Sequence, residues 1–152
     1  MKVSIGCDHG GYELKEFIKE KLEEWEIEIE DFGCFSQDSV DYPDYGYKAS
    51  LAVYEKKADF GIVICTTGIG MSITANKVKN IRAALCYNVY AAKMSRKHNN
   101  ANVLALGAAF VGKKLAEEIV KTFLNEKFDG GRHERRVNKI HDIERRFNNE
   151  LS

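Results

Sequence analysis

The sequence predicts an α/β protein with a doubly wound, five-stranded parallel sheet and helices on both of its faces. Short apolar segments alternate five times with longer segments of helical periodicity along the 152 residues. This alternation is typical of parallel sheets whose crossover connections are helices. Because such crossovers are right-handed, few arrangements remain, and the simplest has the strand order 2-1-3-4-5 in three α/β/α layers.

The predicted strands are short and mostly apolar, as expected where both faces of a sheet are covered. The second strand differs, because Ile27 to Glu30 alternates between apolar and charged residues, which indicates one solvent-facing side. We expect the strands at residues 3–7, 27–30, 60–64, 82–85 and 103–106.

The intervening segments carry apolar residues at intervals of three and four, the spacing of one helix face. In the first segment these residues include Leu14, Ile18 and Leu22. A polar loop at residues 33–43 separates the second strand from the second helix. We expect the helices at residues 12–25, 45–56, 72–78, 89–97 and 113–124.

The chain is predicted to be a single domain, 1–152, in which residues 126–152 form a C-terminal extension and helix. The helix is strongly charged and has one narrow apolar stripe. The stripe residues are Val137, Ile140, Ile143 and Phe147. A stripe of this kind, placed after the sheet is complete, predicts packing on a partner subunit.

Composition excludes several classes of partner. Lys plus Arg and Asp plus Glu both total 23, so no charge excess indicates a nucleic acid or a membrane surface. No apolar run approaches the roughly 20 residues of a membrane span. The chain begins directly with a strand and no signal peptide, so we expect a cytoplasmic protein with reduced thiols. Its cysteines are Cys7, Cys34, Cys65 and Cys86, with no C-x-x-C spacing, and each is most simply a small buried residue.

Reactive side chains and glycines gather where the first and third predicted strands end. The first strand ends in Cys7-Asp8-His9-Gly10-Gly11, and the third in Cys65-Thr66-Thr67-Gly68. In the predicted strand order the chain changes direction between these two strands, and ligands bind in such a crevice. We therefore expect the active site at this point.

The segment after Cys65 combines a thiol with an anion pocket. A strand that enters a Gly-rich turn and then a helix N-terminus presents backbone N–H groups and the positive end of the helix dipole. A thiolate on its rim is stabilised and can remove a proton or attack a carbonyl. A buried structural cysteine is the alternative interpretation. Asp8 and His9 suit proton transfer or ligand binding, and the alternative for Asp8 is a helix cap.

No cofactor is predicted. Gly68-Ile69-Gly70 resembles part of a dinucleotide fingerprint, but Ile73 stands at its third glycine position. The fourth strand is followed by Cys86-Tyr87-Asn88, which offers no acidic residue for a ribose, and no P-loop motif is present.

Two further groups lie outside this crevice. Arg132 and Arg136 follow a Gly-Gly pair and project from one side of a helix, where they form either an anion site or a solvated basic face. His98 lies in the predicted loop before the fifth strand, away from the crevice in this topology. For His98 to take part, either a folded-back helix or a second subunit must supply it.

Five motifs together resemble ribose-5-phosphate isomerase type B, a family that includes allose- and galactose-6-phosphate isomerases. The resemblance covers nearly the whole chain. The motifs are Gly6-Cys7-Asp8-His9-Gly10-Gly11, Asp41-Tyr42-Pro43, the segment from Cys65 to Lys77, Ser95-Arg96-Lys97-His98-Asn99 and Gly130-Gly131-Arg132-His133. It implies a Rossmann-like α/β/α fold, a homodimer or tetramer with shared active sites, and metal-free aldose–ketose isomerisation through a cis-enediolate.

The resemblance also implies roles for individual residues. Cys65 is the base that moves the proton between C1 and C2, and Thr67 and His98 assist ring opening. The implied substrate-binding residues are Asp8, His9, Tyr42, Gly68, Ile69, Gly70, Met71, Ser72, Asn99, Arg132 and Arg136. Among these, the backbone from Gly68 to Ser72 stabilises the enediolate, while Arg132, Arg136 and His9 bind the phosphate.

Two residues depart from the pattern of the family. Thr66 stands where the motif usually has glycine, and Ala109 stands where many members have an arginine that helps to hold phosphate. In spite of these two departures, the resemblance predicts an isomerase that interconverts ribose 5-phosphate and ribulose 5-phosphate. The alternatives are a six-carbon aldose 6-phosphate isomerase, acting on allose or galactose 6-phosphate, and a non-catalytic phosphosugar-binding module.

Overall fold

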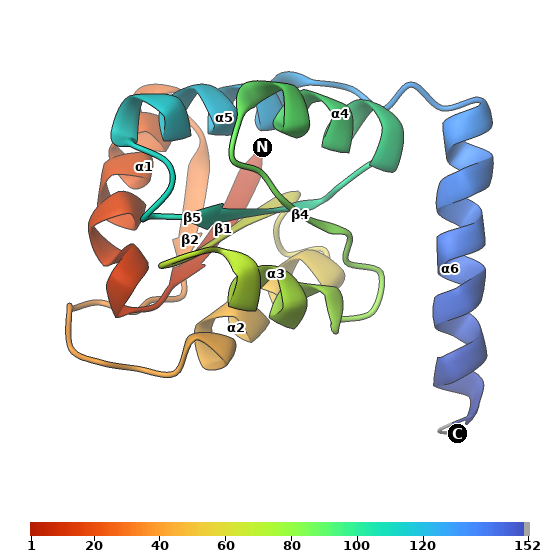
Figure 1. Cartoon of the computed structure of the whole chain (residues 1–152), viewed down its shortest axis with the longest axis horizontal. Coiled ribbons are helices and arrows are strands. Elements are labelled where there is room, and N and C mark those ends of the chain that lie inside the picture. The colour runs from red at the N-terminus through yellow and green to blue at the C-terminus, as the bar shows by residue number, and fades with distance from the viewer. Residues whose placement is uncertain (151–152) are drawn as a thin grey trace.

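The computed structural model describes residues 1–150 and shows one parallel sheet between two layers of helices (Figure 1). The strands are β1 (Lys2–Cys7), β2 (Glu28–Asp31), β3 (Phe60–Cys65), β4 (Ala83–Leu85) and β5 (Val103–Gly107). The helices are the short 3-10 helix η1 (His9–Gly11), α1 (Tyr12–Glu24), α2 (Tyr42–Tyr54), α3 (Ile69–Asn76), α4 (Val89–Asn99), α5 (Lys113–Asn125) and α6 (Arg132–Glu150). The predicted α/β class with its five strands is confirmed.

The predicted strand order is wrong at one edge of the sheet. The observed order is β2-β1-β3-β5-β4, so the fifth strand lies next to β3 and the fourth forms the edge. All five residues of β5 are buried, whereas β4 has three residues, each only partly buried. A strand in the middle of a sheet is covered on both faces, and an edge strand is short and less covered. The longer apolar run of β5 therefore takes the inner position.

The crossovers place α1, α4 and α5 on one face of the sheet and α2 and α3 on the other (Figure 1). Side chains of β1 alternate between two cores, as the pleat requires. Val3 and Ile5 belong to the core under α1 and α5. Ser4 faces α2 and donates a hydrogen bond to Ala49 O at 2.7 Å. This contact holds α2 close against the sheet.

Helices α2 and α3 both begin three residues earlier than predicted, and both begin at the same end of the sheet. Pro43 lies in the first turn of α2, where a missing N–H costs no helical hydrogen bond. Gly68 precedes α3 with a φ of 81°, a left-handed conformation that suits glycine. Both helix N-termini therefore face the carboxyl ends of β1 and β3.

A buried ion pair fixes the segment after β2. Lys15 is fully buried and its Nζ donates to both carboxylate oxygens of Asp31 at 2.9 Å and to Cys34 O at 2.6 Å. Burial would raise the pKa of Asp31, but hydrogen bonds from Lys19 and Lys15 outweigh it and lower that pKa. Breaking such a pair leaves a buried charge without a partner. The segment after β2, which includes Cys34, is therefore anchored in the core.

All four cysteines are free and buried, as predicted. Burial raises the pKa of the Cys7 thiol, and it raises the pKa of Cys86 to about 11. Both thiols are therefore protonated at neutral pH.

Helix α6 projects from the rest of the molecule (Figure 1). Its main polar contacts with the body join Glu144 to the amide of Asn80 and His141 to Arg82. Its apolar residues Ile140, Ile143 and Phe147 are exposed. Among residues 1–150, no helix is both long enough and apolar enough to cross a membrane.

Candidate active site

A cavity of about 430 Å³ lies at the carboxyl ends of β1 and β3, where the sequence predicts the crevice. It is lined by Asp8, Tyr42, Cys65, Thr66, Thr67, Ile69, Gly70 and Ile73. Six of these are predicted site residues. The error in strand order does not move the cavity, because β1 and β3 are neighbours in both arrangements.

Cys65 is the last residue of β3 and is 5% exposed. Its Sγ accepts a hydrogen bond from the amide of Gly68 at 3.2 Å. A Cβ at Gly68 would lie 2.8 Å from the carbonyl carbon of Leu106 and 2.9 Å from the nitrogen of Gly107. Only glycine fits this turn, and the turn is what directs an N–H group at the sulfur. The sulfur is therefore held beside the N-terminus of α3.

The N-terminus of α3 supplies further N–H groups. The hydroxyl of Thr67 accepts a hydrogen bond from the amide of Ile69 at 3.2 Å, so it caps the helix. The amide of Ser72 donates to Gly68 O at 2.9 Å and makes the first bond of the helix. The amides of Gly70 and Met71 come before that bond and remain for a ligand. The Met71 side chain is fully buried, so only its backbone can serve the cavity.

Asp8 caps a helix, which was one of the alternatives left open by the sequence, and it also lines the cavity. Its carboxylate accepts a hydrogen bond from the amide of Gly11 at 3.1 Å and caps η1. Asp8 lines the same cavity as Cys65. His9 lies outside the cavity lining. Its Nδ1 accepts a hydrogen bond from the amide of Val40 at 3.2 Å, which leaves Nε2 for another partner.

Tyr42 covers the cavity from the start of α2. A Cβ at Gly70 would lie 2.6 Å from the Tyr42 ring, so glycine at this position lets the ring pack onto the first turn of α3. The ring therefore forms one wall beside the exposed amides of that turn.

The two departures from the family pattern lie together. The amide of Ala109 donates to Thr66 O at 2.9 Å, and both residues line a second cavity of about 420 Å³ that adjoins the first. Thr66 fits because of Gly10, where an added Cβ would lie within 2.2 Å of the Thr66 hydroxyl. Gly10 is a residue whose role sequence reasoning missed. The sequence feature that could have indicated this role is the glycine pair that closely follows β1.

The remaining predicted residues lie at the opposite end of the sheet. His98 and Asn99 end α4 rather than lying in a loop, and β5 starts just after them. Cys65 pairs in register with Gly107, at the far end of β5. Four residue steps along a strand span roughly 13 Å, so about this distance along β5 separates the end beside Cys65 from the end that follows His98 and Asn99. His98 is on the last turn of α4, and Arg132 and Arg136 are at the start of α6. These two helix ends lie together, away from the turn between β3 and α3 (Figure 1).

His133 is a second residue whose importance the sequence did not reveal. Its ring stacks on that of His98, with centroids 4.0 Å apart and planes 7° from parallel. Loss of hydration and the nearby charges of His98, Arg132 and Arg136 lower the pKa of His133. Its sequence signal was its place at the end of the motif Gly130-Gly131-Arg132-His133.

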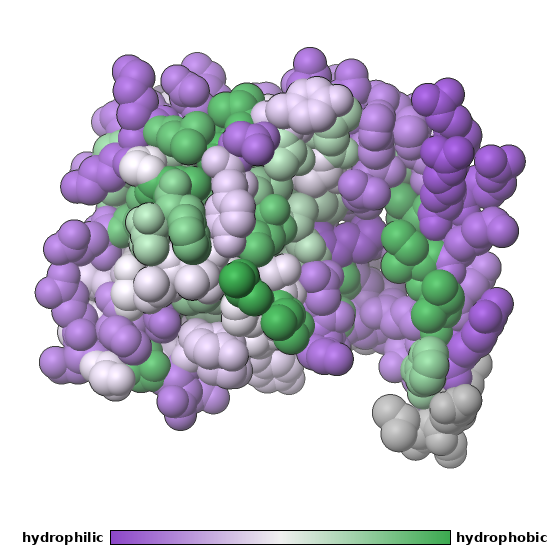
Figure 2. Space-filling view, in the orientation of Figure 1, coloured by the Kyte–Doolittle hydropathy of each residue, from purple (hydrophilic) through white to green (hydrophobic). Residues whose placement is uncertain are grey.

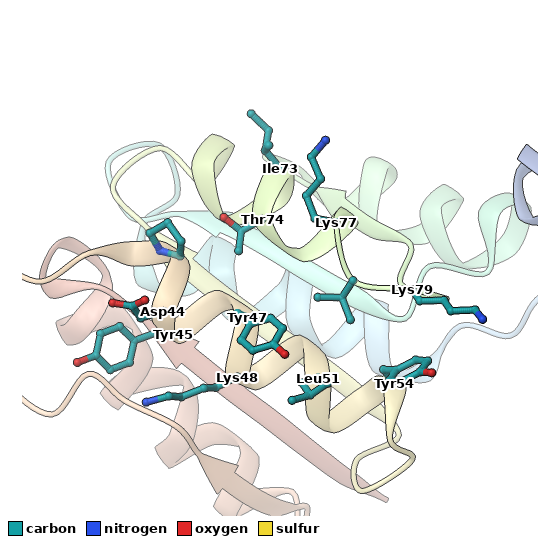
Figure 3. A pocket seen from close by; sticks show the side chains of 12 residues that line it. Asp44, Tyr45, Tyr47, Lys48, Leu51, Tyr54, Ile73, Thr74, Lys77 and Lys79 are labelled. Atoms are coloured by element: carbon teal, nitrogen blue, oxygen red, sulfur yellow. The ribbon is translucent and has the colours of Figure 1, made fainter. Parts of the chain in front are cut away.

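A larger hollow of about 940 Å³ lies between the outer sides of α2 and α3 (Figure 3). Tyr47, Leu51 and Tyr54 come from α2, Ile73 comes from α3, and Lys77 directly follows α3. It holds no cysteine or histidine, so it is not the chemical centre. It shares Ile73 with the active cavity.

A parallel sheet with a thiol, a carboxylate and a helix N-terminus at one switch point has the construction of an α/β enzyme that performs acid–base chemistry on a small anionic substrate. Comparison with known proteins agrees. The family described as Ribose/Galactose Isomerase matches residues 3–140. The chain is 46% identical over 147 residues to ribose-5-phosphate isomerase B of Escherichia coli strain K12, covering 97% of this chain and 99% of the relative.

Solved structures give the same result. Ribose-5-phosphate isomerase B of Clostridium thermocellum has a TM-score of 0.96 and 54% identity, with 97% of this chain and 99% of that chain covered. A ribose 5-phosphate isomerase of Thermotoga maritima has a TM-score of 0.91 and 51% identity, with 93% and 97% covered. This chain belongs to the Ribose/Galactose Isomerase family, and it is an isomerase with the Rossmann-like fold of that family.

Proposed function

We propose that this enzyme interconverts ribose 5-phosphate and ribulose 5-phosphate without a cofactor. The observation that carries the proposal is the thiol of Cys65, which accepts the Gly68 N–H at the head of α3 inside the cavity. This arrangement pairs a base with donors for an oxyanion, and aldose–ketose isomerisation needs both.

The proton transfer follows from the geometry. The Cys65 thiolate removes the proton from C2 of the open-chain aldose, and the C–H electrons form the C1–C2 double bond of a cis-enediolate. The negative charge that develops on the C1 oxygen is stabilised by the amides of Gly70 and Met71 and by the α3 dipole. The proton of the C2 hydroxyl passes to the C1 oxygen within the enediolate. The thiol then returns its proton to C1, and C2 becomes the carbonyl carbon. Asp8 binds sugar hydroxyls, and Tyr42 encloses them.

Ring opening and phosphate binding are assigned mainly to residues outside the cavity at Cys65. Thr67 and His98 move protons to and from the ring oxygen and the anomeric hydroxyl, with Asn99 in contact with the sugar. Arg132 and Arg136, with Nε2 of His9, bind the phosphate through charge-assisted hydrogen bonds. The separation of Cys65 from His98 within one chain means that His98, Asn99, Arg132 and Arg136 come from a second copy.

A homodimer, or a tetramer made of such dimers, supplies that second copy. Val137, Ile140, Ile143 and Phe147 recur at intervals of three and four, which places them on the same side of α6 as Arg136. Figure 2 shows apolar side chains along the side of α6 that faces the body across a gap. Packing this stripe on a partner therefore also directs the arginines towards it. We propose that this assembly acts in the cytoplasm, where thiols stay reduced.

The test is isomerisation of ribose 5-phosphate in D2O by the wild type and by the Cys65→Ala variant, followed by NMR. We expect deuterium incorporation and ribulose 5-phosphate from the wild type, and a loss of roughly 10²–10⁴-fold in turnover in the variant. Cys86→Ala is the matched control, because it removes a buried thiol outside the cavity and should remain active. A wild type that binds ribose 5-phosphate without exchange would instead favour the phosphosugar-binding module.

Six-carbon 6-phosphates are a second candidate, favoured by the open cavity beside Thr66 and Ala109. A longer sugar has room to extend there. Comparison of kcat/KM for ribose 5-phosphate, allose 6-phosphate and galactose 6-phosphate decides between them. A higher value for either six-carbon substrate would reassign the physiological substrate but keep the reaction.

A further inference from the structure

Three possible metal ligands meet where α4 ends and α6 begins. His98 is on the last turn of α4, Asp129 is in the connecting segment, and His133 is on the first turn of α6. One ligand atom from each residue lies within 4.8 Å of the other two. No step of the proposed reaction uses Asp129 or His133.

The backbone holds these side chains together. The amide of Asp129 donates to Lys97 O at 3.0 Å, and the amide of His133 donates to Gly130 O at 3.1 Å. The two imidazole rings are stacked at 4.0 Å. His133 is buried and His98 is half-buried, whereas Asp129 is exposed and leaves an open path from solvent. The cluster is therefore ordered and also accessible.

The ligand set selects the kind of metal. Two imidazoles and one carboxylate, with a fourth position for water, are a common Zn²⁺ set. Zn–N bonds of about 2.0–2.1 Å place tetrahedral ligand atoms roughly 3.4 Å apart. Because the two rings lie nearly parallel, one of them must turn out of the stack for both nitrogens to point at the same metal. Mg²⁺ and Ca²⁺ require mainly oxygen ligands, and only one carboxylate is present. The positive charges of Lys97, Arg132 and Arg136 oppose any cation, so only a metal with high affinity for imidazole competes.

We propose that His98, Asp129 and His133 form a Zn²⁺ site that inhibits the enzyme. The metal displaces the weak pairing of Lys97 with Asp129, whose charged atoms are 3.8 Å apart, and takes the imidazole of His98. Binding of the metal is independent of the proposed function. The inhibitory effect rests on it, because it requires His98 to act in ring opening.

Binding is tested by titrating the full chain with Zn²⁺ alone in a competition assay against a chromophoric chelator. We expect one site per chain whose affinity falls in Asp129→Asn and in His133→Gln by more than the roughly 10–100-fold that loss of an outer-shell partner costs. Glu134→Gln, which removes a neighbouring exposed carboxylate, is the matched control and should bind like the wild type. Mg²⁺ should not compete.

Cys65 is the main competitor for the metal, so Cys65→Ser is titrated in parallel. If Zn²⁺ binding is lost in Cys65→Ser and kept in Asp129→Asn, the metal binds the thiol and the proposal is wrong. In activity assays, Zn²⁺ should inhibit the wild type reversibly with EDTA, and Asp129→Asn should be active and resistant. Inhibition of both proteins at the same Zn²⁺ concentration would also overturn it. A failure of isomerase activity altogether would leave the binding result standing and would count against the proposed function instead.

Discussion

The cavity at Cys65 and the cluster at the start of α6 differ in how the fold builds them. The cavity is formed by the ends of two neighbouring strands and by two helix N-termini, with Cys65 and Asp8 almost fully buried. The cluster lies at the other end of β5, where α4 ends and where α6, a helix that projects from the body, begins with exposed arginines. The proposed base and oxyanion donors therefore lie together within one chain, whereas His98, Arg132 and Arg136, which we propose for ring opening and phosphate binding, lie apart from them. The difference supports the proposal that a second copy of the chain completes the site.

Subunit mixing gives the largest expected effect. Cys65→Ala and His98→Ala proteins should each be nearly inactive, because each removes one half of every site. After unfolding and refolding of an equal mixture, half of the dimers are mixed, and one of their two sites is intact, so activity should recover to about one quarter of wild type. No recovery in a mixture that forms mixed dimers would mean that both groups act within one chain.

The apolar stripe of α6 provides the next test. Ile143→Asp should weaken association by about 3–6 kcal/mol, because burial of an isoleucine contributes 1.5–3 kcal/mol and a two-fold interface contains it twice. Analytical ultracentrifugation should show monomers that retain the circular dichroism of the fold and have lost activity. Asn138→Asp introduces the same charge on the opposite side of α6 and should remain associated. Equal behaviour of the two variants would exclude the stripe as the contact.

The arginines should affect binding more than chemistry. Arg132→Ala and Arg136→Ala each remove a charged hydrogen bond of about 1.5–3 kcal/mol, which corresponds to a KM about 10–150-fold higher. The value of kcat should change much less, because the phosphate is remote from C1 and C2. Arg135→Ala removes an equal charge from the neighbouring position and should leave KM within about twofold. A fall in kcat with unchanged KM would contradict the assignment to phosphate.

The two regions also differ in how far the sequence predicts them. The cavity could be located because β1 and β3 end in reactive residues, and their adjacency depends only on the first crossovers. The sequence does not predict that β5 rather than β4 lies next to β3, because this order depends on which strand the helices cover more fully. The sequence does not predict the contact of His98 with His133 either, since that contact depends on how the segment between α5 and α6 brings the ends of two helices together.

Gly10 and Thr66 give the smallest expected effect, and they test how tightly the cavity is built. Gly10→Ala places a methyl group within 2.2 Å of the Thr66 hydroxyl, so one of the two segments must shift. Overpacking of this kind costs about 1–3 kcal/mol, and the melting temperature should fall by a few degrees. The double variant Gly10→Ala/Thr66→Gly removes the obstructing side chain. It should regain more stability than Thr66→Gly costs alone, and this coupling is measurable in a double-mutant cycle. Additive effects would mean that the two segments do not meet in solution. Gly130→Ala is the matched control for this cycle, because a Cβ at Gly130 would meet nothing within 4 Å. Its cost in stability comes only from the φ of 69° at that position. That cost should therefore be the same with threonine or glycine at position 66.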